Sequence, residues 1–221
     1  MFDQIIIGDK ASYDDFEANV SERRIKDGKK KEIKDSVPFS NVTHDFSAIN
    51  GEVYWEEKEL EYIFEIEADT PEELEEKKVA FKSWIMNVMN EKLYDPYIRD
   101  YHFIATYNDI DPDDSEVEKS TITVKFTAYP YMIANNAKNY KIALEASKEA
   151  TVTIVNNSSH RITPTFTADV AFTVKMGDSS FAVPSGETTD DSFKLAVGKN
   201  VLTLEATESG TVNISFYEEV F

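Results

Sequence analysis

The sequence predicts a mainly β protein that carries one long helix in its first half and is divided into two domains. Three observations favour this fold class. Apolar and polar residues alternate with a period of two along many short runs, one segment repeats its apolar residues at helical spacing, and turn residues separate the runs of the second half. The chain has 221 residues, of which 41% are hydrophobic, so each of two small domains can bury a core.

The helix is predicted over about residues 71–93. Thr70 is a suitable cap, Pro71 suits the first helical position, and Glu73 completes a capping box with Thr70. The apolar residues that follow recur at intervals of three and four and share one face: Leu74, Phe81, Trp84, Ile85, Val88 and Met89. Such a face is typical of a helix packed on an antiparallel sheet, and the alternative is the lining of a ligand pocket.

Strands are predicted around this helix at 60–66, 101–107 and 122–128, where apolar residues alternate with polar ones. Before them, residues 21–35 form a charged run centred on Asp27-Gly28, the two-residue signal of a type I′ hairpin.

The charged run has the opposite sign to the rest of the protein. It contains seven basic and four acidic residues inside a chain whose net charge is −19. One interpretation is a solvated ribbon, a second is contact with an acidic surface of a neighbouring copy, and a third is contact with nucleic acid. The second interpretation predicts a subunit interface formed by Arg23, Arg24, Lys26, Lys29, Lys30, Lys31 and Lys34.

The second half consists only of short strand-like runs. The polar segment 135–139 lacks periodicity and is predicted to separate a first domain at 1–134 from a second at 135–221. Short strands separated by clusters of turn residues predict an antiparallel sandwich. The predicted strands are 151–155, 165–170, 193–197, 201–204 and 212–217.

Composition excludes several kinds of function. A pI near 4.5 opposes binding to the phosphates of nucleic acid, and the absence of cysteine removes disulfides, thiol nucleophiles and cysteine-based zinc sites. The first ten residues, with three consecutive isoleucines, resemble neither a signal peptide nor a membrane span, so we expect the chain to be made and assembled in the cytoplasm.

No catalytic, cofactor-binding or metal-binding residue is predicted. The three histidines, His44, His102 and His160, lie far apart in the sequence and lack partners at metal-ligand spacing. Asp109, Asp111 and Asp113 have the spacing of the first calcium ligands of an EF-hand, but Asp114 and Ser120 stand where that loop needs glycine and glutamate. We therefore expect a solvated hairpin tip there and no enzyme activity.

The order of short features in the first half carries a resemblance. It runs from PheAspGlnIleIleIleGlyAsp at the start through the charged run, SerValProPhe (36–39) and GlyGluValTyrTrp (51–55) to the capped helix and AlaTyrProTyr (128–131). This order resembles the N-terminal domain of the distal tail proteins (Dit) of long-tailed bacteriophages, the siphophages, over about residues 1–134. The second half is similar to the galectin-like β-sandwich of that family, in 197–204 leading into 210–217.

The sequence departs from the family pattern at two places. Many members carry a ValProGlyArg-type loop and a later Tyr-x-x-Arg, whereas Phe39 to Asn41 follow ValPro here and Glu57 and Lys58 follow TyrTrp. The resemblance therefore leaves the ring contacts of these loops undefined.

The resemblance implies a structural protein of a phage or prophage virion. Members form a homohexameric ring at the tail tip, or baseplate, in which the N-terminal domains make the ring and the sandwiches lie outside it. The ring joins the tail tube protein to the hub and, in some phages, to receptor-binding proteins. The alternative is a carbohydrate-binding protein that acts through the sandwich, for which the candidate aromatic platform is Phe181, Phe193 and Tyr217. An enzyme of unrecognised class is a third possibility.

Overall fold

The computed structural model describes residues 3–36, 41, 43–48, 51–111 and 114–221. The ValPro segment at 37–40 and Asp113 of the acidic loop lie outside this part of the chain. The chain divides into two compact units, residues 1–132 together with Phe221, and residues 133–220. Each unit has its own hydrophobic core.

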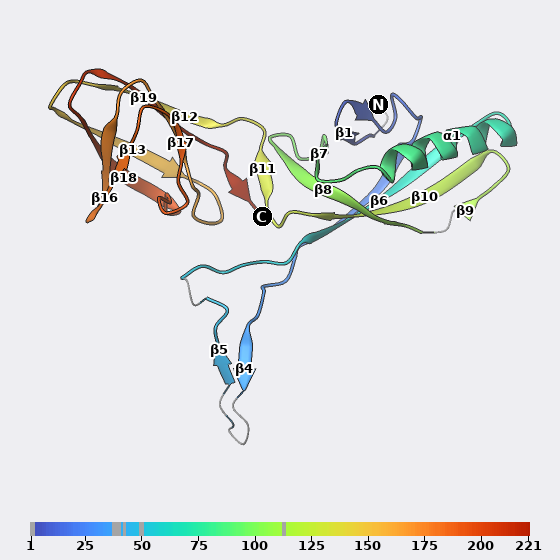
Figure 1. Cartoon of the computed structure of the whole chain (residues 1–221). Coiled ribbons are helices and arrows are strands. Elements are labelled where there is room, and N and C mark those ends of the chain that lie inside the picture. Colours follow the sequence, from blue (N-terminus) through green and yellow to red (C-terminus); the bar gives the residue numbers. More distant parts are fainter. Residues whose placement is uncertain (1–2, 37–40, 42, 49–50, 112–113) are drawn as a thin grey trace. The chain divides into compact units, whose positions relative to one another are not determined.

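The first unit is an antiparallel sheet in the order β2-β1-β7-β8-β10-β6-β3, with the short β9 paired to β10 (Figure 1). Its central ladder pairs β6 with β10 from Glu67 opposite Lys119 to Lys58 opposite Ala128. Alternate residues of both strands are buried, so one face of the sheet packs on the core and the other faces solvent. The strands are β1 (Ile6–Ile7), β2 (Lys10–Ala11), β3 (Asn19–Lys26), β6 (Lys58–Glu67), β7 (Glu91–Tyr94), β8 (Tyr101–Ile110), β9 (Asp114–Ser115) and β10 (Lys119–Ala128).

Helix α1 (Pro71–Ile85) packs on the buried face of this sheet (Figure 1). The Phe81 ring lies 4.8 Å from that of Phe64 on β6 and 6.1 Å from that of Phe16, while Phe16 stacks on Trp84 at 4.7 Å. The predicted apolar face is therefore core except for Met89, which is 76% exposed. The strands predicted at 60–66, 101–107 and 122–128 are confirmed.

The predicted end of the helix at residue 93 is wrong, because α1 ends at Ile85. Asn87 and Val88 donate backbone hydrogen bonds three residues back instead of four, and Asn90 adopts a left-handed φ of 55°. The chain then enters β7, which pairs with both β1 and β8. Sheet pairing decides this boundary, since the apolar residues in 86–93 suit a turn and a strand as well as a helix.

The Thr70→Ala substitution tests the cap that begins the helix. The Glu73 N–H donates to Thr70 Oγ1 at 3.2 Å, as the sequence predicts. We expect the substitution to lower the free energy of unfolding of the first unit by about 1 kcal/mol in urea titrations. Ser83→Ala, an exposed change on the same helix, should alter it by less than about 0.5 kcal/mol. Equal effects of the two substitutions would contradict the capping role.

The second unit is an antiparallel sandwich of two four-stranded sheets, in the orders β12-β19-β14-β17 and β13-β18-β15-β16. Side chains from both sheets form its core, among them Phe166, Val174, Leu204 and Ile214. The strands are β12 (Lys138–Leu144), β13 (Glu149–Asn156), β14 (Thr165–Ala168), β15 (Phe172–Met176), β16 (Ser179–Val183), β17 (Gly186–Thr189), β18 (Gly198–Ala206) and β19 (Gly210–Phe216). Two further short strands are β11 (Met132–Ala134) and β20 (Glu219–Val220).

The predicted strand at 193–197 is wrong. Phe193 and Leu195 are buried, but only Leu195 makes a β-bridge, to Ile162. Alternating apolar residues can thus fill a core from an irregular segment. The strands β15, β16 and β17 were not predicted, and β12 begins at Lys138, inside the polar segment 135–139.

Candidate assembly surfaces

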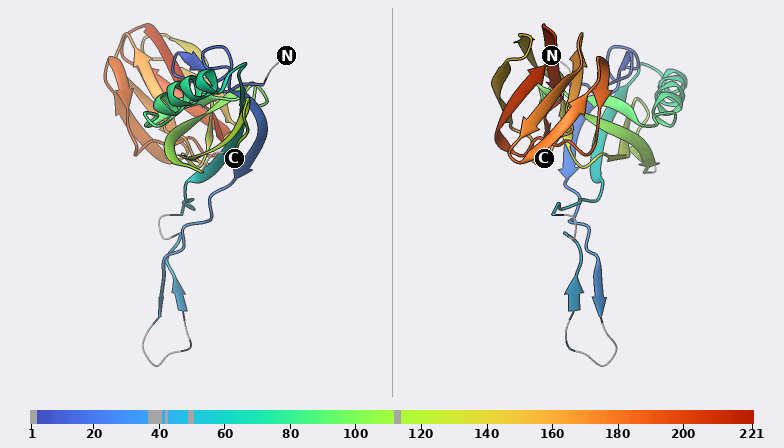
Figure 2. Two further views of the ribbon diagram at one scale, coloured as in Figure 1. Left: turned by 90° about the vertical axis from the view of Figure 1, so that its right-hand side faces the viewer. Right: turned by 60° about the vertical axis from the view of Figure 1, so that its left-hand side comes forward.

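A two-stranded ribbon continues from β3 and β6 of the first unit. Lys26 lies opposite Glu59, Lys30 opposite Trp55, and the Lys31 N–H donates to the Tyr54 carbonyl oxygen at 2.8 Å. Farther along, β4 (Lys34–Ser36) pairs with β5 (Thr43–Asp45). Figures 1 and 2 show the two arms of this ribbon, both from the same polypeptide, running side by side away from β3 and β6.

The hairpin predicted at Asp27-Gly28 is wrong, because the run 21–35 does not fold back on itself. It pairs instead with a later segment, from Glu22 opposite Ile63 to Lys34 opposite Asp45. A β-carbon placed on Gly28 would lie 1.9 Å from the Glu56 carbonyl oxygen. This glycine therefore permits close approach of two backbones and does not form a turn.

The base of the ribbon rests on an aromatic cluster within the first unit. The Trp55 ring lies 4.8 Å from that of Phe221, which lies 4.8 Å from that of Tyr131. Lys58, whose side chain is buried, bonds Asp27 through its Nζ and places that atom 5.8 Å from the centre of the Phe221 ring. These contacts hold the two arms of the ribbon together where they leave the sheet.

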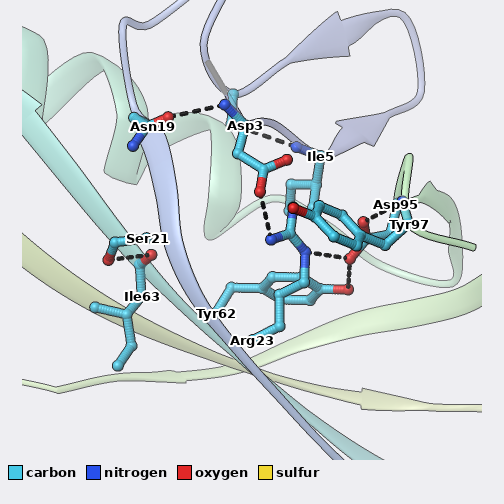
Figure 3. A network of polar contacts seen from close by, with 10 residues as sticks. Asp3, Ile5, Asn19, Ser21, Arg23, Tyr62, Ile63, Asp95 and Tyr97 are labelled. Carbon is cyan, nitrogen blue, oxygen red and sulfur yellow. Dashed lines mark hydrogen bonds and ion pairs between the residues drawn. The ribbon is translucent and has the colours of Figure 1, made fainter. Parts of the chain in front are cut away.

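Arg23 differs from the other predicted interface cations because its side chain points into the first unit (Figure 3). Its Nη1 bonds Asp3 at 2.7 Å and its Nε bonds Asp95 at 2.8 Å, and the Asp95 side chain is fully buried. Asp95 also accepts hydrogen bonds from the Tyr62 hydroxyl at 3.1 Å and from the Tyr97 N–H at 3.0 Å. The network joins β3, β6 and the segment after β7.

The electrostatics of this network suit a structural role. Burial opposes the charge of Arg23, but the hydrogen bonds and charges of Asp3 and Asp95 outweigh it and raise the pKa of Arg23. Burial, reinforced by the Asp95 charge, raises the pKa of Tyr62 well above its usual value, so its hydroxyl stays protonated and donates. The guanidinium of Arg23 also lies 4.3 Å from the centre of the Tyr97 ring.

The remaining six cations lie along exposed parts of β3 and the ribbon. Three have partners in the chain: Arg24 bonds Glu61 at 2.6 Å, Lys26 bonds Glu59 at 2.7 Å, and Lys34 bonds Glu32 at 2.7 Å. Lys29, Lys30 and Lys31 are exposed, and within the described part of the chain neither Lys29 nor Lys31 pairs with a carboxylate. The basic charge without an ion-pair partner is therefore concentrated at Lys29 and Lys31.

The ribbon also exposes large apolar side chains, which the charge pattern did not predict. Ile33 is 62% exposed, and Phe46, Val53 and Tyr54 are between 40% and 49% exposed. The ValTyrTrp run at 53–55 is the sequence signal for this feature. A narrow ribbon cannot bury such residues by itself, so they favour a surface that another molecule covers.

On the solvent face of the central strands, charged side chains pair across strands. Glu59 and Glu61 bond Lys26 and Arg24 of the neighbouring strand, and Lys119 bonds Glu65 at 3.0 Å. The hydrogen bond from Lys26 lowers the pKa of Glu59, and the one to Glu65 raises the pKa of Lys119. Cross-strand pairs thus neutralise the carboxylates of this face.

The histidines and the acidic loop do not come together as a site. His102 is buried on β8 with its ring 5.2 Å from that of Tyr94, and His160 Nε2 lies 2.8 Å from Glu219 in the second unit. The side chain of His44 lies outside the described part. Asp111 bonds Lys125 at 2.6 Å. Among the described residues no cluster suited to a metal ion is found, and no helix there is long and apolar enough to span a membrane.

The aromatic residues considered for carbohydrate binding do not form a platform. Phe193 is buried and packs edge-on against Phe181 at 5.0 Å, so both belong to the sandwich core. Of the three candidates only Tyr217 is exposed. No observation in the second unit therefore favours sugar binding.

No protein-family model and no curated protein sequence matches this chain. Among solved structures it is similar to the Dit protein (gp 19.1) of SPP1, described as a paradigm of the hub adsorption apparatus in phages that infect Gram-positive bacteria. The TM-score is 0.70 at 11% sequence identity, and the match covers 97% of this chain and 98% of that one. This chain therefore has the fold of a phage distal tail protein over nearly its whole length.

Proposed function

We propose that this protein is a structural subunit of the tail tip of a long-tailed phage or prophage. It assembles as a homohexameric ring that connects the tail tube to the hub and, through the hub, to host-recognition proteins. The observation that carries the proposal is the fold match to SPP1 Dit, which extends over both units and leaves almost no part of either chain unmatched. The protein is assembled in the host cytoplasm and acts in the virion, without a cofactor and without enzymatic activity.

The ring is proposed to form through the first unit, residues 1–134 in the sequence-based division, with the sandwich outside it. The ribbon supplies the contact between subunits. Its basic residues Lys29–Lys31 and its exposed apolar side chains suit an acidic partner surface with apolar patches. Another copy of the chain offers such a surface, because the first unit has 31 acidic and 16 basic residues and so carries −15 of the total charge of −19.

Reversal of Lys29, Lys30 and Lys31 to glutamate tests this assignment. We expect the unmodified protein to reach the mass of a hexamer in light scattering over a concentration series. The triple variant should need a protein concentration at least 10-fold higher than the unmodified protein to assemble, because like charges would then face each other. The matched control reverses three exposed cations of the second unit, Lys141, Arg161 and Lys199, which changes the net charge equally. Full assembly of the triple variant would exclude the basic ribbon as the contact.

A further inference from the structure

Helix α1 presents a two-part stripe to solvent. Glu72, Glu76, Val79, Ser83 and Met86 follow each other at intervals of three or four residues and lie on one side of the helix, opposite the face buried in the core. Val79 is 62% exposed and Met86 is 58% exposed. The helix stripe, meaning these five residues, is thus acidic over its first half and apolar over its second.

Among the residues of its own unit that the structure describes, the acidic half of the helix stripe has no ion-pair partner. Lys77 forms ion pairs with Glu73 and Glu17, and Lys78 forms one with Glu75. These cations therefore pair with carboxylates that lie beside the stripe. Within the described residues, no cation pairs with Glu72 or Glu76. The carboxylates on the solvent face of the sheet, by contrast, are already paired across strands.

We propose that the ribbon of one copy docks along the helix stripe of the next copy, an inference that rests on the proposed ring. Lys29 and Lys31 meet Glu72 and Glu76. Ile33 and Phe46, which lie beside each other farther along the ribbon, cover Val79 and Met86. Both surfaces combine unpaired charge of opposite sign with large exposed apolar side chains. The apolar contact provides affinity and the charges set the register.

The lengths of the two surfaces agree. Five residue steps from Lys29 to Lys34 span about 17 Å of strand at roughly 3.3 Å per residue. Fourteen steps from Glu72 to Met86 span about 21 Å of helix at roughly 1.5 Å per residue. One strand of the ribbon can therefore lie along most of the helix stripe.

The contact joins two different surfaces, so its symmetry matters. A basic ribbon cannot pair with another basic ribbon, which makes the interface head-to-tail. Repetition of a head-to-tail contact produces either a closed ring or an open filament. The docking thus supplies the type of interface that a ring needs.

The rival acidic surface in the first unit is the hairpin of β9 and β10. It carries Asp114, Glu116 and Glu118, and its exposed apolar side chain is Val117. The helix stripe is favoured because it pairs two exposed apolar side chains with its carboxylates along a rigid element. Cross-linking separates the two surfaces.

The absence of cysteine from the chain makes site-specific cross-linking direct. Lys31→Cys protein that carries a tag would be mixed with an untagged protein carrying Glu76→Cys, Val79→Cys or Ser83→Cys. After oxidation the tag makes heterodimers and homodimers differ in mass, so the products can be separated. We expect disulfide-linked heterodimers with at least one helix position, since a disulfide needs Cα atoms within about 7 Å. Glu116→Cys on the rival hairpin and Thr153→Cys on the second unit are the controls, and a dominant product at either of them would overturn the proposal.

A charge exchange provides the second test, with assembly measured by light scattering. Lys29→Glu/Lys31→Glu and Glu72→Lys/Glu76→Lys should each raise the concentration for half-assembly about 10-fold or more, and combining all four should restore it to within about 3-fold of the unmodified protein. Asp178→Lys/Glu208→Lys, on exposed sites of the second unit, changes the net charge as the Glu72/Glu76 pair does and should leave assembly unchanged.

The outcomes distinguish this docking from the ring itself. A protein that assembles, gives no ribbon-to-helix cross-link and is indifferent to Glu72→Lys/Glu76→Lys overturns the docking and leaves the ring standing. An unmodified protein that stays monomeric at every concentration overturns the ring and the docking together. Cross-links to the helix stripe with rescue by the charge exchange support both.

Discussion

Phe81→Ala is expected to lower the free energy of unfolding of the first unit by about 3–5 kcal/mol, the usual cost of removing a fully buried aromatic ring. Phe81 is 0% exposed, and its ring lies within about 6 Å of those of Phe16, Phe64 and Trp84, which come from three different segments. Because these rings fix the helix to the sheet, a cavity there is surrounded by elements that cannot all move in to fill it.

Tryptophan fluorescence during urea unfolding measures this effect in the first unit alone. Both tryptophans of the chain, Trp55 and Trp84, lie in that unit, and the Trp84 ring is 5.9 Å from that of Phe81. Val79→Ala, on the exposed side of the same helix, is the control and should change the free energy by less than about 0.5 kcal/mol. A loss below about 1 kcal/mol for Phe81→Ala would show that the helix is not packed as described.

Asp95→Ala is expected to cost the first unit about 3 kcal/mol, since removing one partner of a buried ion pair leaves the other charge uncompensated. Asp95 is fully buried and receives three contacts, from Arg23 Nε, from the Tyr62 hydroxyl and from the Tyr97 N–H. The ring of Tyr97 lies against the Arg23 guanidinium. Arg23 keeps Asp3 in the variant and is 16% exposed, which places the expected loss at the lower end of the range for buried pairs.

Tyr62→Phe is the matched control for Asp95→Ala. It removes only the hydroxyl that donates to Asp95 and preserves the ring in the core, so we expect a loss of about 1 kcal/mol in the same urea titration. If the two variants lost equal stability, the ion pair would contribute nothing beyond one hydrogen bond, and the buried network would not anchor β3. The loss expected at Asp95 also explains why Arg23 is unsuited to a subunit interface.

The positions of the seven predicted interface cations show what the sequence can predict and what it cannot. Their sign and clustering were visible in the sequence, and six of them do lie on exposed parts of β3 and the ribbon. Nothing local distinguished Arg23, whose partners Asp3 and Asp95 lie 20 and 72 residues away. Similarly, Asp27-Gly28 is a good local turn signal, yet the backbone of Glu56 occupies the space beside Gly28.

The sequence by itself determined the mainly β class, the start of the helix at Thr70 and the central strands of both units. Each of these follows from a local period or a cap, which neighbouring residues specify through the geometry of the backbone. Only the tertiary structure decided the end of the helix at Ile85, the irregular conformation of 193–197, the pairing of the ribbon and the inward orientation of the Arg23 side chain. Those features depend on pairing and burial between segments distant along the chain, and such contacts leave no periodic trace in the sequence.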